Sequence, residues 1–127
     1  MAGTAASAAC DTRTLGDVSE LNPEDAKIIT LARAARARSG APEGAAVRDE
    51  TGRTYAGTSV DLPSLKLSAL QVAVAMAVSS GAGDLEAAAV VTAADAPAPS
   101  DLTTVRDLGA KAPVLVAGPD GSLKTTL

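Results

Sequence analysis

The stretch that most constrains the fold runs from Leu67 to Val78 and contains no charged residue. Its alanine, leucine, methionine and glutamine residues favour a helix, and Gly81 supplies a natural stop after it. Ser68, followed three residues later by Gln71, has the pattern of a capping box, so the helix should begin near Ser68. Beyond Gln71 no face of this helix is polar, so we expect it to be buried in the middle of the domain. It is too short to cross a membrane, because a bilayer requires roughly 20 apolar residues.

The chain has 127 residues, which corresponds to one domain, and 46% of them are hydrophobic. Aromatic residues make up only 1%, with Tyr55 as the single example, so the core must consist of small aliphatic side chains. With a net charge of −4, the protein lacks the positive electrostatic potential that attracts nucleic-acid phosphates. A single aromatic side chain cannot form a surface on which several bases stack. We therefore expect neither a nucleic acid nor a membrane as a partner.

The chain contains no histidine and one cysteine, Cys10. This inventory excludes an intramolecular disulfide bond, a histidine-dependent catalytic triad, and a zinc site built from histidine or several cysteines of one chain. Cys10 follows Ser7-Ala8-Ala9, a faint match to a lipoprotein cleavage site that lacks a preceding basic region and a long apolar run. We therefore expect a free thiol in a cytoplasmic protein.

Residues 1–21 are small and polar without sustained periodicity, so we predict a mobile N-terminal tail followed by a folded domain at 22–127. Asn22 is a favourable N-cap, and Pro23 suits the first helical position. The remaining pattern predicts helices at 23–38, 68–78 and 100–108, a loop at 60–64, and strands at 45–49, 53–58, 85–91, 113–117 and 123–126. This order predicts a three-layer α/β/α architecture, with one mixed five-stranded sheet and helices on both faces.

Several short landmarks occur in a characteristic order along the chain. They are Gly44-Ala45-Ala46-Val47, Asp49 to Gly52, Tyr55-Ala56-Gly57, Ala77-Val78-Ser79-Ser80-Gly81, Leu85 to Thr92 and Pro113-Val114-Leu115-Val116. In this order and spacing the chain resembles the zinc-dependent cytidine deaminase family, from about Pro23 to Leu127. The resemblance implies the same α/β fold, and it implies a homo-oligomer because family members commonly assemble as dimers or tetramers.

The resemblance also implies a chemistry, in which a zinc-bound water attacks C4 of cytosine and a glutamate moves the protons. The metal ligands lie in a His/Cys-x-Glu motif and a later Pro-Cys-x-x-Cys motif, both at helix N-termini. In this sequence Ser68 stands at the first ligand position and Leu70 at the glutamate position. Ser100 and Thr103 stand at the two cysteine positions of the second motif. We therefore predict a protein that binds no zinc, needs no cofactor and does not deaminate cytidine.

The family's ribose-binding asparagine and glutamate fall on Ser59 and Asp61 here, and no aromatic residue lies near Gly44 to pack a base. A remnant nucleoside-sized pocket between Gly44, Ser59, Asp61 and Ser68 is one interpretation. The simpler interpretation makes Asp61 a loop or capping acid, and it makes Ser68 and Ser100 the N-caps of their helices.

The sequence thus favours a deaminase-like pseudoenzyme that acts as a structural or partner-binding homo-oligomer. We expect the helix at 68–78 to lie near the subunit interface, with Leu70 as an apolar plug in the former active site. A nucleoside-binding protein is the alternative. An active deaminase, or a hydrolase in which Lys66 serves as the base for Ser68, is the least favoured.

Overall fold

The computed structural model describes residues 21–127, so nearly all of the predicted tail, with Cys10, lies outside the described residues. The helices are α1 (Pro23–Ser39), α2 (Ala69–Ser79) and α3 (Pro99–Leu108). The strands are β1 (Gly44–Asp49), β2 (Thr54–Thr58), β3 (Val60–Leu62), β4 (Leu65–Leu67), β5 (Leu85–Val91), β6 (Val114–Ala117) and β7 (Leu123–Thr126). No helix within residues 21–127 combines the length and the hydrophobicity needed to cross a bilayer.

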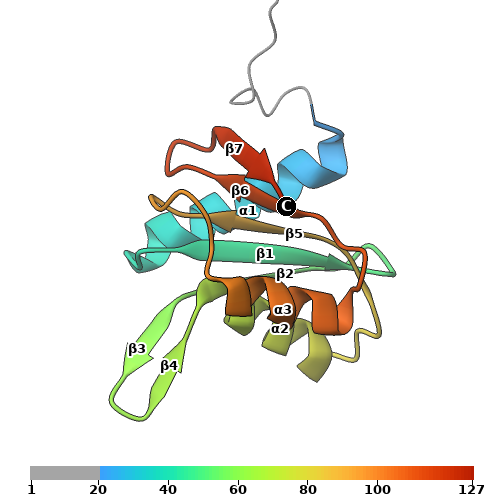
Figure 1. Cartoon of the computed structure of the whole chain (residues 1–127), viewed down its shortest axis with the longest axis horizontal. Coiled ribbons are helices and arrows are strands. Elements are labelled where there is room, and N and C mark those ends of the chain that lie inside the picture. The colour runs from blue at the N-terminus through green and yellow to red at the C-terminus, as the bar shows by residue number, and fades with distance from the viewer. Residues whose placement is uncertain (1–20) are drawn as a thin grey trace, which may run out of the picture.

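Five strands form one mixed sheet in the order β2-β1-β5-β6-β7. β5 and β6 run parallel, whereas the β1–β2, β1–β5 and β6–β7 pairs are antiparallel. α1 covers one face of this sheet, and α2 and α3 lie next to each other over the other face (Figure 1). The predicted architecture, a mixed five-stranded sheet between helices, is therefore confirmed.

The two central strands divide small aliphatic side chains between two cores, because successive side chains of a strand point to opposite faces. Ala45 and Val47 of β1 belong to the core beneath α2 and α3, whereas Ala46 between them belongs to the core beneath α1. β5 is buried throughout residues 87–91 for the same reason. With side chains this small, the helices pack close to the sheet on both faces.

The first helix begins and ends as its sequence predicts. The side chain of Asn22 accepts a hydrogen bond from the backbone N–H of Asp25 at 2.8 Å, which caps the N-terminus of α1. Gly40 follows the last turn in a left-handed conformation with φ 72°, which glycine adopts without strain.

Contrary to the sequence prediction, α2 is not buried on all sides. Its Leu70, Ala73 and Ala77 are buried against the sheet, but Met76 is 45% exposed and Val78 is 53% exposed. The sheet and α3 cover only part of the circumference of the helix, and nothing else within residues 21–127 covers the rest.

Residues 60–64 were predicted as a loop, and this prediction is wrong. β3 and β4 form an antiparallel hairpin, a separate two-stranded sheet that projects from the body of the domain (Figure 1). Pro63 and Ser64 lie between the strands, and both are frequent turn residues. The alternation of aliphatic and charged residues on either side of this turn explains why the segment pairs with itself.

The last helix begins one position earlier than predicted. Ala98 occupies the N-cap of α3 without a side-chain cap, and Pro99 is the first helical residue. Proline favours this position because its φ angle is already helical and its missing N–H is not needed there. Ser100 is therefore not the N-cap of α3.

Candidate functional site

Ser68 lies at the N-cap of α2, where the family resemblance places the first metal ligand. Its Oγ accepts a hydrogen bond from the backbone N–H of Gln71 at 3.1 Å. The Oε1 atom of Gln71 in turn accepts one from the backbone N–H of Ser68 at 2.9 Å. These reciprocal bonds confirm the predicted capping box. The Ser68 hydroxyl thus satisfies a backbone donor that the helix itself leaves without a partner.

Leu70 follows in the first turn of α2 and lies inside the protein, with 1% of its surface exposed. It belongs to the apolar cluster between the sheet and two helices, together with Val47 of β1, Val90 of β5 and Val105 of α3. An aliphatic side chain therefore lies buried at the position to which the family resemblance assigns the proton-transferring glutamate.

Ser100 and Thr103, which the family resemblance places at the other two ligand positions, lie in the first and second turns of α3 and are exposed. Oγ1 of Thr103 donates a hydrogen bond to the carbonyl oxygen of Pro99 at 3.2 Å, one turn earlier in the same helix. α3 packs beside α2 on the same face of the sheet (Figure 1). The fold thus places α2 and α3 side by side. Near their N-termini these helices carry serine and threonine hydroxyls where the family resemblance implies metal ligands.

The residues predicted to line a nucleoside pocket lie in different environments. Gly44 packs against α1, where a Cβ atom would lie only 2.1 Å from the carbonyl oxygen of Ala32. Ser59 follows β2, and its backbone N–H donates to the carbonyl oxygen of Glu43 at 3.2 Å. The Ser59 hydroxyl is buried and has no hydrogen-bond partner in the described part of the chain. Ser59 therefore lies beside the start of β1, while the side of Gly44 that faces α1 leaves no room for a ligand.

Asp61, the last of the four, lies on the β3–β4 hairpin, and its side chain is 84% exposed. It forms an ion pair with Lys66 on the opposite strand of this hairpin. The hairpin therefore gives Asp61 a protein partner, and it directs the ammonium of Lys66 to that carboxylate.

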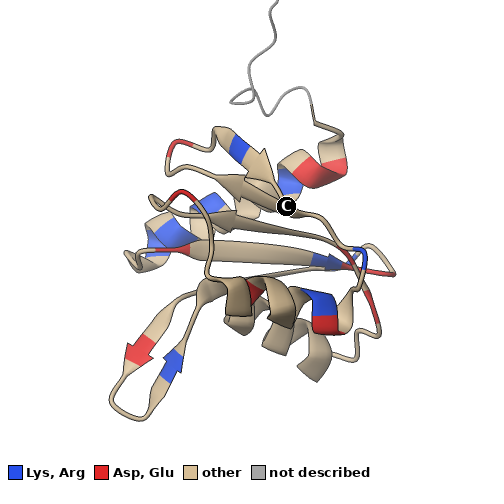
Figure 2. Ribbon diagram, viewed as in Figure 1, with Lys and Arg blue, Asp and Glu red and all other residues tan. Residues whose placement is uncertain are grey.

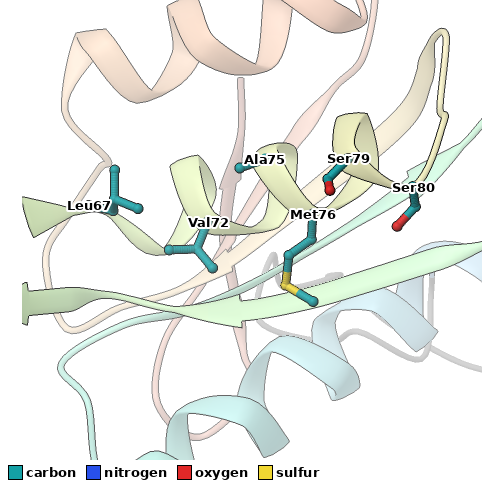
Figure 3. A pocket seen from close by; sticks show the side chains of 6 residues that line it. All are labelled: Leu67, Val72, Ala75, Met76, Ser79 and Ser80. Atoms are coloured by element: carbon teal, nitrogen blue, oxygen red, sulfur yellow. The ribbon is translucent and has the colours of Figure 1, made fainter. Parts of the chain in front are cut away.

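An apolar groove runs along the outer side of α2 and is absent from the sequence-based predictions. It has a volume of about 410 Å³ and is lined by Leu67, Val72, Ala75, Met76, Ser79 and Ser80 (Figure 3). The helical residues recur at intervals of three and four, so they form a single stripe. The lack of charge in residues 67–78 is the sequence signal for this groove, but the same signal is typical of a helix buried within one chain.

Asp49 at the end of β1 is a buried acid that the sequence motifs do not single out. Its carboxylate accepts hydrogen bonds from the side chain and backbone of Thr51, from the backbone of Arg53 and from the hydroxyl of Tyr55. Burial disfavours the charged form, but these bonds outweigh it and hold the pKa of the Asp49 carboxyl well below its ordinary value. Every partner lies in the β1–β2 hairpin, so the network stabilises a turn and is not part of the candidate site.

The cytidine deaminase-like family model matches residues 21–121. The chain belongs to the cytidine deaminase-like family. Its structure is similar to that of a cytidine deaminase from Burkholderia pseudomallei, with a TM-score of 0.70 and 25% identity over 80% of this chain and 89% of that chain. A cytidine deaminase from Mycobacterium tuberculosis gives a TM-score of 0.60 and 25% identity over 77% of this chain and 87% of that one. One from Mycobacterium leprae shares the fold, with a TM-score of 0.63 and 24% identity over 79% and 90% of the two chains.

A search among curated proteins gives no match.

In this cytidine deaminase-like chain, the residues at the N-termini of α2 and α3 do not fit a zinc ion. Zinc sites in proteins use thiolate, imidazole or carboxylate ligands, whereas these positions offer neutral hydroxyls. Oγ of Ser68 already caps α2, and Oγ1 of Thr103 already bonds to Pro99. Within residues 21–127, no three histidine, cysteine, aspartate or glutamate side chains gather in a way that would hold a metal. No catalytic step through zinc follows from this set of donors.

Proposed function

We propose that this protein is a catalytically inactive member of the cytidine deaminase-like family that works as a homo-oligomeric structural or partner-binding module. The burial of Leu70 carries the proposal. Deamination requires a carboxyl group at this position to move protons, whereas Leu70 has no ionisable atom and is 1% exposed. The hydroxyls of Ser68, Ser100 and Thr103 add support, because they are poor substitutes for thiolate ligands.

The homo-oligomeric part of the proposal is supported by the outward face of α2. Met76 and Val78 leave large apolar areas in water, at 45% and 53% exposure. Met76 also lines the apolar groove together with Leu67 and Val72, and exposed apolar grooves mark interaction sites in soluble proteins. The single cysteine suits a reducing compartment, so we also propose a cytoplasmic location.

Two measurements test the inactive assignment. Elemental analysis after dialysis should find far less than one zinc per chain, and incubation with cytidine or deoxycytidine should yield no uridine or deoxyuridine. A catalytically competent cytidine deaminase, treated identically, is the control for both assays. Stoichiometric zinc that survives a chelator, or measurable turnover by the unmodified protein, would overturn the proposal.

A second candidate function is the binding of a nucleoside or a similar small molecule, and the hydroxyl of Ser59 favours it. This hydroxyl is buried without a partner among the described residues, whereas buried polar groups are almost always hydrogen-bonded. If a nucleoside supplies the missing partner, it should raise the melting temperature of the wild type and not that of Ser59→Ala. An active hydrolase has less support, because Lys66 pairs with Asp61.

A further inference from the structure

The last turns of α1 gather positive charge that no carboxylate pairs with. Arg33, Arg36 and Arg38 lie close together there, in a protein whose net charge is −4 (Figure 2). Within residues 21–127, none of the three forms an ion pair with a carboxylate. Positive charge stabilises the C-terminal end of a helix, but that role requires no fixed position of the guanidinium groups.

Two of these guanidinium groups are held in place by backbone carbonyl oxygens of other segments. Nε of Arg33 donates a hydrogen bond to the carbonyl oxygen of Pro119 at 3.1 Å. Nε of Arg36 donates one to the carbonyl oxygen of Pro42 at 2.9 Å. Neither carbonyl belongs to α1, so these bonds do not cap the helix. Each guanidinium group is thus anchored through Nε, and its two outer nitrogens make no hydrogen bond to another described residue.

The two anchoring carbonyls lie at the same edge of the five-stranded sheet. β1 starts and β6 ends beside Val91, the last residue of β5. Pro42 lies two residues before β1, and Pro119 lies two residues after β6. Arg33 and Arg36 are neighbours on the surface of α1, because residues three apart on a helix lie on the same side. The fold therefore presents two anchored guanidinium groups over the end of β5.

The acids near this edge have other hydrogen-bond partners. Oδ1 of Asp120 accepts a hydrogen bond from the backbone N–H of Ser122 at 2.9 Å, and Oδ2 accepts one from its hydroxyl at 2.9 Å. These bonds lower the pKa of the Asp120 carboxyl, and the charge of Arg33 makes a smaller contribution in the same direction. The carboxylate of Glu43, just before β1, accepts a hydrogen bond from the hydroxyl of Thr92 at 2.8 Å. The arginines are therefore left without an acid partner among the described residues.

The chemistry of two anchored guanidinium groups selects a doubly charged oxyanion. The outer nitrogens of an arginine form a planar fork that matches two oxygens of a carboxylate or a phosphate. One fork suffices for a carboxylate, whereas a phosphate monoester carries a charge of about −1.5 to −2 and three acceptor oxygens. The net charge of −4 repels a long polyanion, so the site suits a single phosphate group and not a nucleic acid.

We propose that Arg33 and Arg36 bind the phosphate group of a phosphate monoester, with Arg38 adding positive charge nearby. α1 covers the face of the sheet opposite to α2 and α3 (Figure 1). The site is therefore separate from the deaminase positions at the N-termini of α2 and α3, and it goes beyond the proposed function. A small metabolite and a phosphorylated side chain of a partner both carry this group.

Isothermal titration calorimetry with inorganic phosphate, at an ionic strength held constant with sodium chloride, tests the site. Glutamine places an amide nitrogen where arginine has Nε, so an arginine-to-glutamine change preserves the anchor and removes the fork and the charge. Arg33→Gln combined with Arg36→Gln should raise the dissociation constant for phosphate at least about tenfold. Arg36→Lys, which keeps the charge without the fork, should have an intermediate effect. Lys111→Gln is the matched control, because this exposed cation precedes β6 at the opposite edge of the sheet, and it should bind as the wild type does.

Asp120→Asn gives a change in the opposite direction, which misfolding cannot imitate. It removes a negative charge near Arg33 and keeps a side-chain oxygen that accepts from Ser122, so it should lower the dissociation constant for phosphate. Circular dichroism melting verifies that every variant is folded. A wild type that does not bind phosphate, or that binds it no better than the double glutamine variant, would overturn the site.

Two further ligands distinguish the sources of the phosphate group. Glycerol 2-phosphate represents a small phosphate monoester, and a peptide with one phosphoserine represents a phosphorylated partner. Equal affinities indicate a small-molecule ligand, whereas tighter binding of the peptide indicates a protein partner. Failure of both esters to bind would overturn the proposal. Because these titrations involve neither zinc nor turnover, their failure leaves the inactive assignment in place, and deaminase turnover would leave the phosphate site in place.

Discussion

The hydroxyl of Tyr55 donates a hydrogen bond of 2.8 Å to Oδ2 of Asp49 across the β1–β2 hairpin. Tyr55 is the single aromatic residue of the chain, and its polar end is directed to a buried acid. The other carboxylate oxygen, Oδ1, accepts bonds of 2.7 to 3.0 Å from Thr51 and Arg53. Because the folded hairpin supplies all these donors, it favours the ionised form of Asp49 more than the unfolded chain does.

The first prediction is that Asp49→Asn weakens the pH dependence of stability. Folding lowers the pKa of the Asp49 carboxyl from an unfolded value of about 3.9. The contribution of this carboxylate to the free energy of unfolding is therefore complete above about pH 3.9, and it is lost as the pH falls towards the folded pKa. The difference in unfolding free energy between wild type and Asp49→Asn should be largest near neutral pH and should shrink in acid. Urea titrations at several pH values measure it.

The control is Asp107→Asn, which removes an exposed carboxylate from α3. Its stability should follow that of the wild type at every pH. A constant difference between wild type and Asp49→Asn from neutral pH into acid would contradict the role assigned to the hydrogen bonds of Asp49.

The second prediction concerns Leu70, the buried side chain that the family resemblance places at the glutamate position. Leu70→Glu should lower the free energy of unfolding by more than about 3 kcal/mol, because an unpaired carboxylate would be taken out of water. Leu70→Met, which nearly conserves volume, should cost less than about 1.5 kcal/mol. Chemical denaturation of both variants measures the difference. An unchanged stability for Leu70→Glu would indicate a water-filled pocket and favour the ligand-binding alternative.

Local sequence patterns predicted much of the fold because helix starts and buried strands are determined largely by residues close together in the sequence. Asn22 before Pro23, and Ser68 before Gln71, mark the helix starts that the structure confirms. The continuous apolar run at 85–91 predicted a central strand covered on both faces, and β5 is that strand. Ser100 misled the prediction because Pro99 also favours the start of a helix, and proline at the first position prevailed.

Features that depend on contacts between distant residues could not be predicted from these patterns. The charge-free stretch at 67–78 indicates an apolar surface, but it does not say whether the same chain covers that surface. In the structure one side of α2 meets the sheet and another side forms the groove. Strand register and helix packing likewise determine that Gly44 lies against α1 and that the hydroxyl of Ser59 has no partner among residues 21–127.

The third prediction distinguishes the structural roles of Ser68 and Ser100, the two serines that the family resemblance places at metal-ligand positions. Ser68→Ala should cost about 1 kcal/mol of unfolding free energy, because it removes the side-chain acceptor that caps α2. Ser68→Asp should retain most of the stability, since aspartate caps equally well. Ser100→Ala should change stability by less than about 0.5 kcal/mol, because the exposed Ser100 is not the N-cap of α3. Equal losses at both serines, measured by urea denaturation, would contradict the assignment.

The fourth prediction tests whether Gly44 has a packing role or belongs to a ligand pocket. A Cβ atom at this position would lie 2.1 Å from the carbonyl oxygen of Ala32 and 2.9 Å from Cβ of Arg36. Because the nearest atom belongs to the helix backbone and cannot rotate away, α1 must shift, and Gly44→Ala should cost about 1–3 kcal/mol. At Gly83 the nearest atom is the flexible carboxylate end of Glu50 at 3.1 Å, so Gly83→Ala is the matched control with a smaller cost.

Urea unfolding of the two glycine variants, together with nucleoside thermal shifts, distinguishes the two roles of Gly44. A packing role predicts a lower unfolding midpoint for Gly44→Ala than for Gly83→Ala. A pocket role predicts nearly unchanged stability and the loss of a nucleoside-induced shift that the wild type would show. The close approach of β1 to α1 favours the first outcome, because the carbonyl oxygen of Ala32 already occupies the space that a side chain at residue 44 would need.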